Sequence, residues 1–181
     1  MAKLIFGMLQ SLDGYVSGPE GGGDLPMPNE ALMQHFNEQG RALTASLYGR
    51  TMYEIMRYWD NDDPEHDEAS RAFARDWQGR PKFVVSSTLK SLGKNATLID
   101  GDLEAAVRKL KTEYGGEIDV AGPELAAGLG ALGLIDEYQL YLQPVVLGGG
   151  KPFFHGARPP LRFKSSERID EDVVLLTYVP A

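Results

Sequence analysis

The sequence predicts an α/β domain whose helices pack on a mostly parallel sheet that ends in antiparallel strands. Short apolar segments typical of buried strands alternate with segments of helical periodicity over most of the chain. Near the C-terminus, two strand-like segments, 161–169 and 173–179, follow one another around Asp170 and Glu171, as in a hairpin. The length of 181 residues suits one compact domain, so residues 1–181 are expected to form a single unit.

The composition excludes several classes of function. With 26 acidic and 18 basic residues, the chain has a formal net charge of −8 and shows no basic stripe, which argues against nucleic acid and anionic membranes as partners. The absence of cysteine excludes disulfides, zinc thiolate sites and thiol nucleophiles, and the three histidines share no metal-ligand spacing, so no metal site is expected. No segment has the length of a signal peptide or a membrane span. We therefore expect a cytoplasmic protein.

The first quarter of the chain is expected to form a strand, a long loop and a helix. Residues 3–9 are apolar, and after a turn Tyr15-Val16-Ser17 forms a short extended piece. Residues 18–28 are rich in Gly and Pro, and long loops of this kind often serve as lids or binding loops. Asn29 is a good N-cap for an amphipathic helix. The apolar stripe of this helix is predicted to contain Leu32, Met33, Phe36 and Leu43.

The alternation continues through the rest of the chain. A strand from Ala45 runs into a helix at Arg50, and an acidic loop follows at residues 60–65. Pro123 is expected to open a helix from its favoured first position. The other expected elements are helices at 68–77 and after Asp102, strands at 82–86, 97–99 and 117–121, and a long strand around Tyr138, Leu140 and Leu142 that ends at Pro144 and a bend at Gly148-Gly149-Gly150-Lys151.

The most informative motif is the strand-to-helix corner at Gly49-Arg50-Thr51. A helix start leaves backbone N–H groups unpaired and carries a partial positive charge, and Gly49 lets an anion approach the backbone. Arg50 adds a planar fork of donors that matches phosphate, and Thr51 adds a hydroxyl. In an acidic chain this corner indicates a nucleotide cofactor. The alternative is a tight turn with a surface arginine.

Two more polar corners follow strands of the same predicted sheet. They are Ser86-Ser87-Thr88 and Gly122-Pro123-Glu124. Ligands of open α/β sheets bind in the crevice beyond the carboxyl ends of the strands. The three corners are therefore expected to contribute to one ligand site at this edge of the sheet.

In order and spacing, these segments resemble the dihydrofolate reductase fold, and within it the C-terminal reductase domain of riboflavin-biosynthesis enzymes. The resemblance covers nearly the whole chain. Its further motifs are Ser11-Leu12-Asp13-Gly14, Val120-Ala121-Gly122-Pro123-Glu124-Leu125, Leu134-Ile135-Asp136-Glu137 and residues 140–150. It implies a three-layer fold with a mostly parallel central sheet and antiparallel C-terminal strands. It also implies a reductase that uses NADPH as its hydride donor.

The resemblance assigns the cofactor contacts. Arg50 and Ser87 would hold the adenosine 2′-phosphate, the helix start at 122–125 would lie under the pyrophosphate, and the backbone around Leu9 and Val16 would flank the nicotinamide. The complete set of expected cofactor contacts is Leu9, Val16, Gly49, Arg50, Thr51, Ser86, Ser87, Thr88, Gly122, Pro123, Glu124 and Leu125.

The chain departs from the family pattern at several positions. Met52 stands where family members carry a Thr whose hydroxyl contacts phosphate, and Ala121-Gly122 replaces a Gly-Gly pair that is often cis. The folate enzyme has a carboxylate in its first helix that protonates the pterin, and Glu30 is the local candidate. Asp13 is a second candidate for the catalytic proton source, or else forms a turn with its own backbone.

The sequence thus predicts an NADPH-dependent reductase that transfers hydride to a C=N or C=O carbon of a small heterocycle or phosphoribosylamino-pyrimidine. Gln143 faces either the core or this substrate, and the 18–28 loop is the expected lid. The alternatives are a dihydrofolate or pterin reductase and a non-catalytic protein that binds NADP(H) or a pterin. Riboflavin-type relatives pair through edge strands and the region 140–147, so the resemblance also implies a homodimer.

Overall fold

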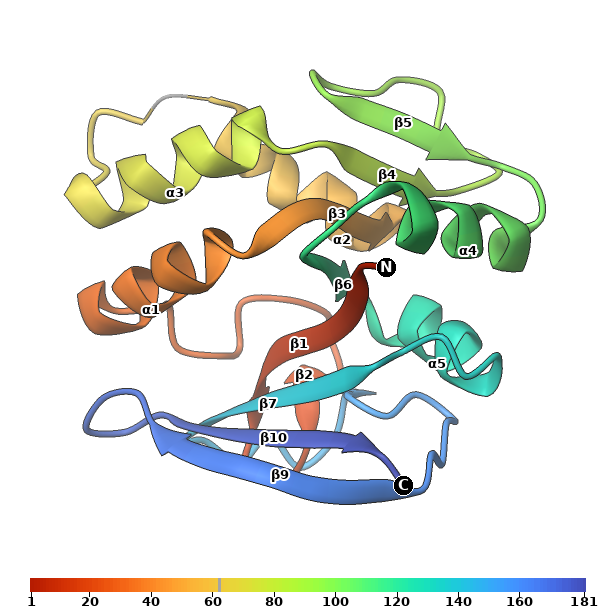
Figure 1. Ribbon diagram of the computed structural model, residues 1–181. Helices are drawn as coiled ribbons and strands as arrows, with labels where there is room; N and C mark the ends of the chain where they lie inside the picture. Colours follow the sequence, from red (N-terminus) through yellow and green to blue (C-terminus); the bar gives the residue numbers. More distant parts are fainter. Residues whose placement is uncertain (62) are drawn as a thin grey trace.

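The computed structural model describes residues 1–61 and 63–181, and in these the chain is built around an eight-stranded sheet (Figure 1). The strands are β1 (Lys3–Ser11), β2 (Tyr15–Ser17), β3 (Leu43–Gly49), β4 (Lys82–Val85), β5 (Ala96–Ile99), β6 (Glu117–Ala121), β7 (Glu137–Gln143), β8 (Lys151–Pro152), β9 (Leu161–Arg168) and β10 (Val174–Pro180). The large sheet has the order β5-β4-β3-β6-β1-β7-β10-β9. Neighbouring strands from β5 to β7 run parallel, and β10 and β9 are antiparallel to their neighbours.

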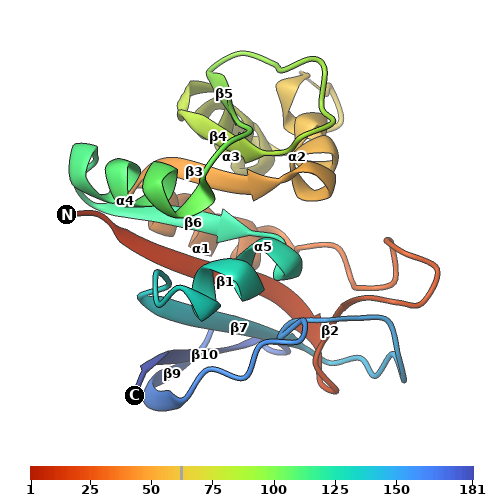
Figure 2. The ribbon, with the colours of Figure 1, turned by 90° about the vertical axis from the view of Figure 1, so that its right-hand side faces the viewer.

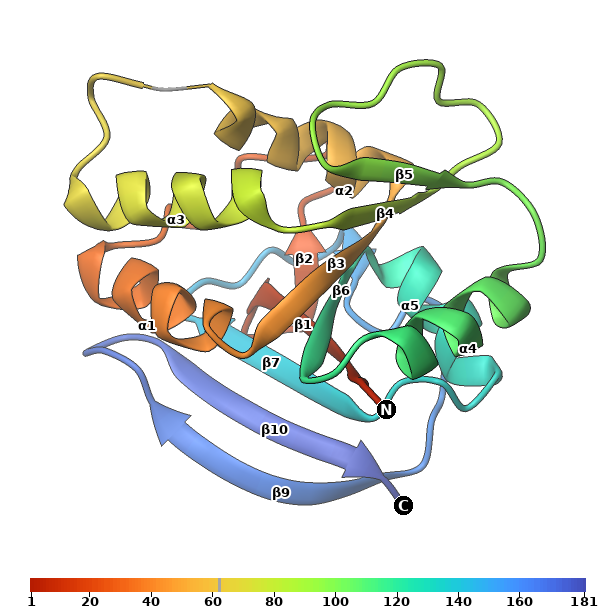
Figure 3. The ribbon, with the colours of Figure 1, turned by 45° about the horizontal axis from the view of Figure 1, so that its top comes forward.

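Helices cover both faces of this sheet, as Figures 1 and 3 show. They are α1 (Glu30–Gly40), α2 (Arg50–Met56), the 3-10 helix η1 (Arg57–Asp60), α3 (Glu68–Gly79), α4 (Leu103–Glu113) and α5 (Pro123–Ala131). The α4 and α5 helices lie on one face, and α1, α2 and α3 lie on the other. The three-layer prediction is therefore confirmed. Within the described residues, no helix has both the length and the apolar character that crossing a membrane requires.

Burial on the two faces fixes the register of the central strands. On one face, Phe6, Leu47 and Val120 come from paired strands and pack against Leu129 of α5. On the other face, Tyr48 and Val84 pack with Tyr53 and Trp77 in a second cluster. Each fully buried side chain of this size contributes about 1.5–3 kcal/mol. Because a slip of one residue would turn every such side chain to the wrong face, the observed register is strongly specified.

The structure corrects the predicted end of the first helix. The Asn29 side chain caps α1 as predicted, with its Oδ1 accepting from the N–H of Leu32 at 2.9 Å. The helix ends at Gly40, however, and Leu43 begins β3 instead of continuing the apolar stripe. The carbonyl of Ala42 accepts from the N–H of Glu117 at 3.1 Å. Pairing with β6 therefore recruits this segment into the sheet, and helical periodicity alone does not reveal it.

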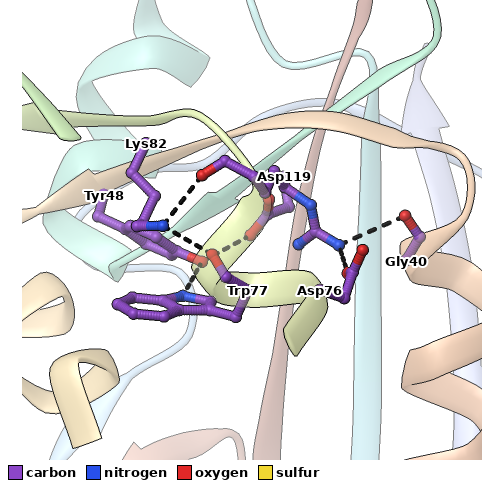
Figure 4. Close-up of polar contacts among 7 residues, drawn as sticks. Gly40, Tyr48, Asp76, Trp77, Lys82 and Asp119 are labelled. Atoms are coloured by element: carbon purple, nitrogen blue, oxygen red, sulfur yellow. Dashed lines mark hydrogen bonds and ion pairs between the residues drawn. The ribbon is translucent and has the colours of Figure 1, made fainter. Parts of the chain in front are cut away.

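A buried polar cluster connects α3 to the sheet (Figure 4). The Lys82 ammonium donates to the carbonyls of Trp77 at 2.6 Å and Arg80 at 3.0 Å, and it lies 4.2 Å from the centroid of the Trp77 ring. The Tyr48 hydroxyl donates to Asp119 at 3.3 Å and accepts from the Trp77 indole at 3.3 Å. A cation at the C-terminal end of a helix satisfies carbonyls that have no helical partner. Lys82 therefore fixes the end of α3 against β4.

Candidate functional site

The candidate site lies where the parallel strands end. Because β4, β3, β6, β1 and β7 run in the same direction, their carboxyl ends share one edge of the sheet, which Figure 2 shows. The three polar corners predicted from the sequence are the connections that leave β3, β4 and β6 at this edge.

The corners at Gly49 and Gly122 lie against each other. A Cβ atom built on Gly122 would lie 3.8 Å from the backbone nitrogen of Gly49 and 3.9 Å from Cβ of Met52. Gly122 also has a φ of 116°, which residues with a side chain rarely adopt. Neither glycine provides a side-chain cap for the helix that follows it. Two helix starts that lack side-chain caps therefore lie side by side, an arrangement suited to an anion.

Arg50 connects the Gly49 corner to the Ser86-Ser87-Thr88 corner. Its Nη1 donates to Oγ1 of Thr88 at 2.7 Å, and its Nε pairs with Glu54 at 3.0 Å. The hydroxyl of Ser86 accepts from the N–H groups of Thr88 at 3.2 Å and Leu89 at 3.0 Å, so Ser86 shapes the turn. Ser87 is exposed in this turn. The expected combination of one guanidinium and neighbouring hydroxyls is thus assembled at the surface.

Lys151 is a functional candidate that the sequence interpretation missed. Its ammonium lies 2.8 Å from the carboxylate of Glu124, in the first turn of α5, and this contact holds the pKa of Glu124 below its ordinary value. The position depends on the small β2–β8 sheet, in which Ser17 pairs with Lys151. A side chain at Gly150 would overlap the Ser17 carbonyl, so only glycine permits this approach. The Gly148-Gly149-Gly150-Lys151 run is the available signal, but its glycines by themselves predict only a bend.

Asp13 connects two loops of the site. Its carboxylate accepts from the N–H groups of Leu147 at 3.1 Å and Gly148 at 2.7 Å. A hydrogen bond with the Ser11 side chain, followed by these backbone bonds, lowers the pKa of Asp13. The carboxylate therefore holds the loop after β1 against the loop after β7 and favours its ionised form. This arrangement does not suit a proton donor. The partners of Asp13 include Ser11 of its own turn as well as the backbone of the loop after β7.

Glu30 and the two apolar candidates lie around the same edge. Glu30 is exposed at the start of α1, accepts from Gln34 at 3.1 Å and borders an open hollow of ≈ 450 Å³. Leu9 packs against the cluster beneath α1, whereas Val16 packs against the cluster on the α5 face. The two side chains therefore share no common surface, and the contact of their backbone with the nicotinamide stays a prediction. The Ala121–Gly122 peptide is trans, because the described residues contain no cis peptide bond.

Gln143 lies at the end of β7, facing the interior. It is 2% exposed and pairs with Ser11 across the β1–β7 ladder. Its Nε2 donates to the carbonyl of Pro26 in the 18–28 loop at 2.9 Å. Within the described residues its Oε1 is buried without a hydrogen-bond partner. The side chain therefore faces the loop region at the edge of the sheet.

The fold and the edge site together define the class of protein. Dihydrofolate reductase from Enterococcus faecalis, solved with NADP(H) bound, superposes with a TM-score of 0.63 at 16% identity, covering 98% of this chain and 96% of that one. This likeness, together with the sheet order and layers, makes the fold dihydrofolate reductase-like.

Within that class, the profile of the RibD C-terminal domain matches residues 2–175, and the chain belongs to this family. The Bacillus subtilis protein YyaP, which is uncharacterized, is 27% identical over 183 residues, or 97% of this chain and 94% of YyaP. A Shewanella sp. PV-4 protein provisionally assigned to riboflavin biosynthesis superposes with a TM-score of 0.77 at 25% identity over 100% and 99% of the two chains. The Thermotoga maritima deaminase and 5-amino-6-(5-phosphoribosylamino)uracil reductase superposes with a TM-score of 0.69 at 14% identity, over 99% of this chain and 57% of that one.

Proposed function

We propose that this protein is an NADPH-dependent reductase that transfers hydride to a C=N or C=O carbon of a small heterocycle of the phosphoribosylaminouracil type. The observation that carries the proposal is the Arg50–Thr88 contact beside the paired helix starts at Gly49 and Gly122. A guanidinium with hydroxyls suits a phosphate monoester, and paired helix starts suit a pyrophosphate. Membership of the RibD C-terminal domain family and the NADP(H) complex of the E. faecalis enzyme support the same cofactor.

The residues present fit this cofactor. Arg50, Ser87 and Thr88 would hold the 2′-phosphate, and the start of α5 with Lys151 would hold the pyrophosphate. When bound, NADPH supplies the hydride, while the protein binds, orients and excludes water. Glu30 at the start of α1, directly or through a water, is the candidate proton source, because the carboxylate of Asp13 is already engaged by two backbone N–H groups.

One observation favours a second candidate function, a non-catalytic NADP(H)-binding protein. Met52 lies next to Gly122 between the two helix starts, where the family pattern supplies a hydroxyl. In addition, the carboxylate of Asp13 is held by two backbone N–H groups. Cofactor binding is therefore better supported than the presence of a catalytic proton donor.

The loss of NADPH absorbance in the presence of candidate substrates distinguishes these functions. We expect the protein to oxidise NADPH with 5-amino-6-(5-phosphoribosylamino)uracil or a related ring, and more slowly or not at all with dihydrofolate. Turnover of dihydrofolate alone would favour the pterin reductase alternative. NADPH binding without turnover of any ring in the panel would favour the non-catalytic alternative.

A further inference from the structure

Gln143 has a buried hydrogen-bond acceptor that nothing in the described chain satisfies. Its Oε1 has no partner, although the residue is 2% exposed and its Nε2 is bonded to Pro26. Buried polar atoms are almost always hydrogen-bonded, and leaving one unpaired costs about 1–3 kcal/mol. Such an atom at the carboxyl end of a strand, next to the candidate site, indicates a missing donor.

The orientation of this amide is determined by its surroundings. The carbonyl of Pro26 can only accept a hydrogen bond, so the nitrogen of Gln143 must face it and the oxygen must face elsewhere. The backbone of Gln143 is held as well, because its carbonyl accepts from Val145 N–H at 2.8 Å and the carbonyl of Val145 accepts from Leu12 at 2.8 Å. The unsatisfied oxygen is therefore fixed in place before any ligand arrives.

The 18–28 loop that Gln143 contacts has few packing contacts with the rest of the molecule. Figure 2 shows it projecting beyond the edge of the sheet. At its tip, a side chain on any of Gly21, Gly22 and Gly23 would meet no atom within 4 Å, and Met27 is 84% exposed. Its few anchors include the bond from the Gly18 N–H to Asp24 at 3.0 Å and the Gln143–Pro26 bond. Segments with so few buried contacts open at low free-energy cost.

We propose that Gln143 is a specificity residue for the substrate, with Oε1 accepting the ring amide N–H of a neutral heterocycle and Nε2 holding the 18–28 loop closed over that ring. The inference rests on the proposed function and adds to it the residue that recognises the ring of the substrate. A pyrimidine or pterin ring with an unsubstituted lactam N–H satisfies the buried oxygen. A ring that is N-alkylated at this position leaves it unsatisfied.

The test compares two probe compounds. One is 5,6-diaminouracil, and the other is 1,3-dimethyl-5,6-diaminouracil, which lacks ring N–H groups. Binding to the protein saturated with NADP⁺ is measured by calorimetry for the wild type, for Gln143→Met, and for Gln139→Met as a control on the same face of β7. We expect the dimethyl ring to bind the wild type at least about tenfold more weakly than the parent ring. We expect Gln143→Met to weaken binding of the parent ring similarly and to abolish the difference between the rings, and Gln139→Met to behave as the wild type.

Hydrogen exchange gives a second readout that does not depend on the variant. The parent ring should slow exchange of the 18–28 amides in the wild type, and the dimethyl ring should not. Equal binding of the two rings to the wild type, or no binding of the parent ring once NADP⁺ is bound, overturns the inference. Unchanged binding of the parent ring by folded Gln143→Met also overturns it, and a structural water on Oε1 would give that result. Failure of NADP⁺ itself to bind would instead contradict the proposed function.

Discussion

Arg50 is shared between a carboxylate and a hydroxyl at the surface. Glu54, one turn later in α2, neutralises part of its charge, and Thr88 holds the far end of its guanidinium. A phosphate dianion that reached Arg50 would meet the negative charge of Glu54. At the scale of single residues, the proposed phosphate and Glu54 would therefore compete for one guanidinium.

Removing this competitor should strengthen NADPH binding. Glu54→Gln keeps the shape of the side chain and removes its charge, and an exposed pair of this kind is worth about 0.2–1 kcal/mol. We expect the NADPH affinity to rise about two- to fivefold in a fluorescence titration. Glu104→Gln, in the corresponding pair with Arg108 on α4, serves as the control and should change nothing. A fall in affinity for Glu54→Gln would show that Glu54 orients Arg50 instead of competing for it.

Some of the candidate site residues can be identified from the sequence, and others cannot. Arg50 stood out because Gly, a planar cation and a helix start occur together. The partners of Asp13 and Lys151 lie 134 and 27 positions away in the chain, in the loop after β7 and in the first turn of α5, respectively. Their partners follow from how β1, β7 and β8 are placed, which no local pattern describes.

At the scale of elements, local signals determined most boundaries. Asn29, Asp67 and Asp102 cap their helices with side-chain acceptors, and Pro123 opens α5. The exceptions are segments whose state depends on a neighbour. Leu43 joins β3 because β6 lies beside it, and β8 exists only as the partner of β2.

The cluster beneath α3 gives an element-scale prediction about pH. Burial raises the pKa of Asp119, with Arg80 acting in the opposite direction. A carboxyl with a raised folded-state pKa contributes stability that is fully present below its unfolded pKa of about 3.9. This contribution is lost as pH rises through the folded pKa, and each tenfold difference in proton affinity between the folded and unfolded states is worth about 1.4 kcal/mol.

Asp119→Asn removes this titration. The free energy of unfolding of the variant minus that of the wild type should therefore increase as pH rises from about 4 to about 8. Urea denaturation at a series of pH values measures this difference. Asp100→Asn, which replaces an exposed carboxyl, is the matched control for the change of side chain. A constant difference for Asp119→Asn would show that the attraction of Arg80 cancels the effect of burial, and a decreasing difference would show that it outweighs burial; either result contradicts the prediction.

At the scale of the whole molecule, strand order gathers the chemistry. The first strand of the chain lies near the centre of the large sheet, between β6 and β7, so β1 and its neighbours end at one edge. The alternating pattern predicted the layers and the antiparallel end, which the structure confirms. The dinucleotide site that the family resemblance implies stays a prediction. The burial of Gln143 and its hydrogen bond to Pro26 in the 18–28 loop are tertiary features, and the strand pattern does not predict them.

The central claim is that this edge binds NADPH through Arg50. Titration of the wild type, Arg50→Ala and Arg108→Ala with NADPH and with NADH, followed by cofactor fluorescence, tests it most directly. Charge-assisted hydrogen bonds are worth about 1.5–3 kcal/mol. We therefore expect Arg50→Ala to lose roughly 10- to 100-fold in NADPH affinity and to change little toward NADH. Arg108→Ala should match the wild type with both cofactors. Failure of NADPH to bind the wild type, or equal losses for both cofactors in Arg50→Ala, would contradict the account.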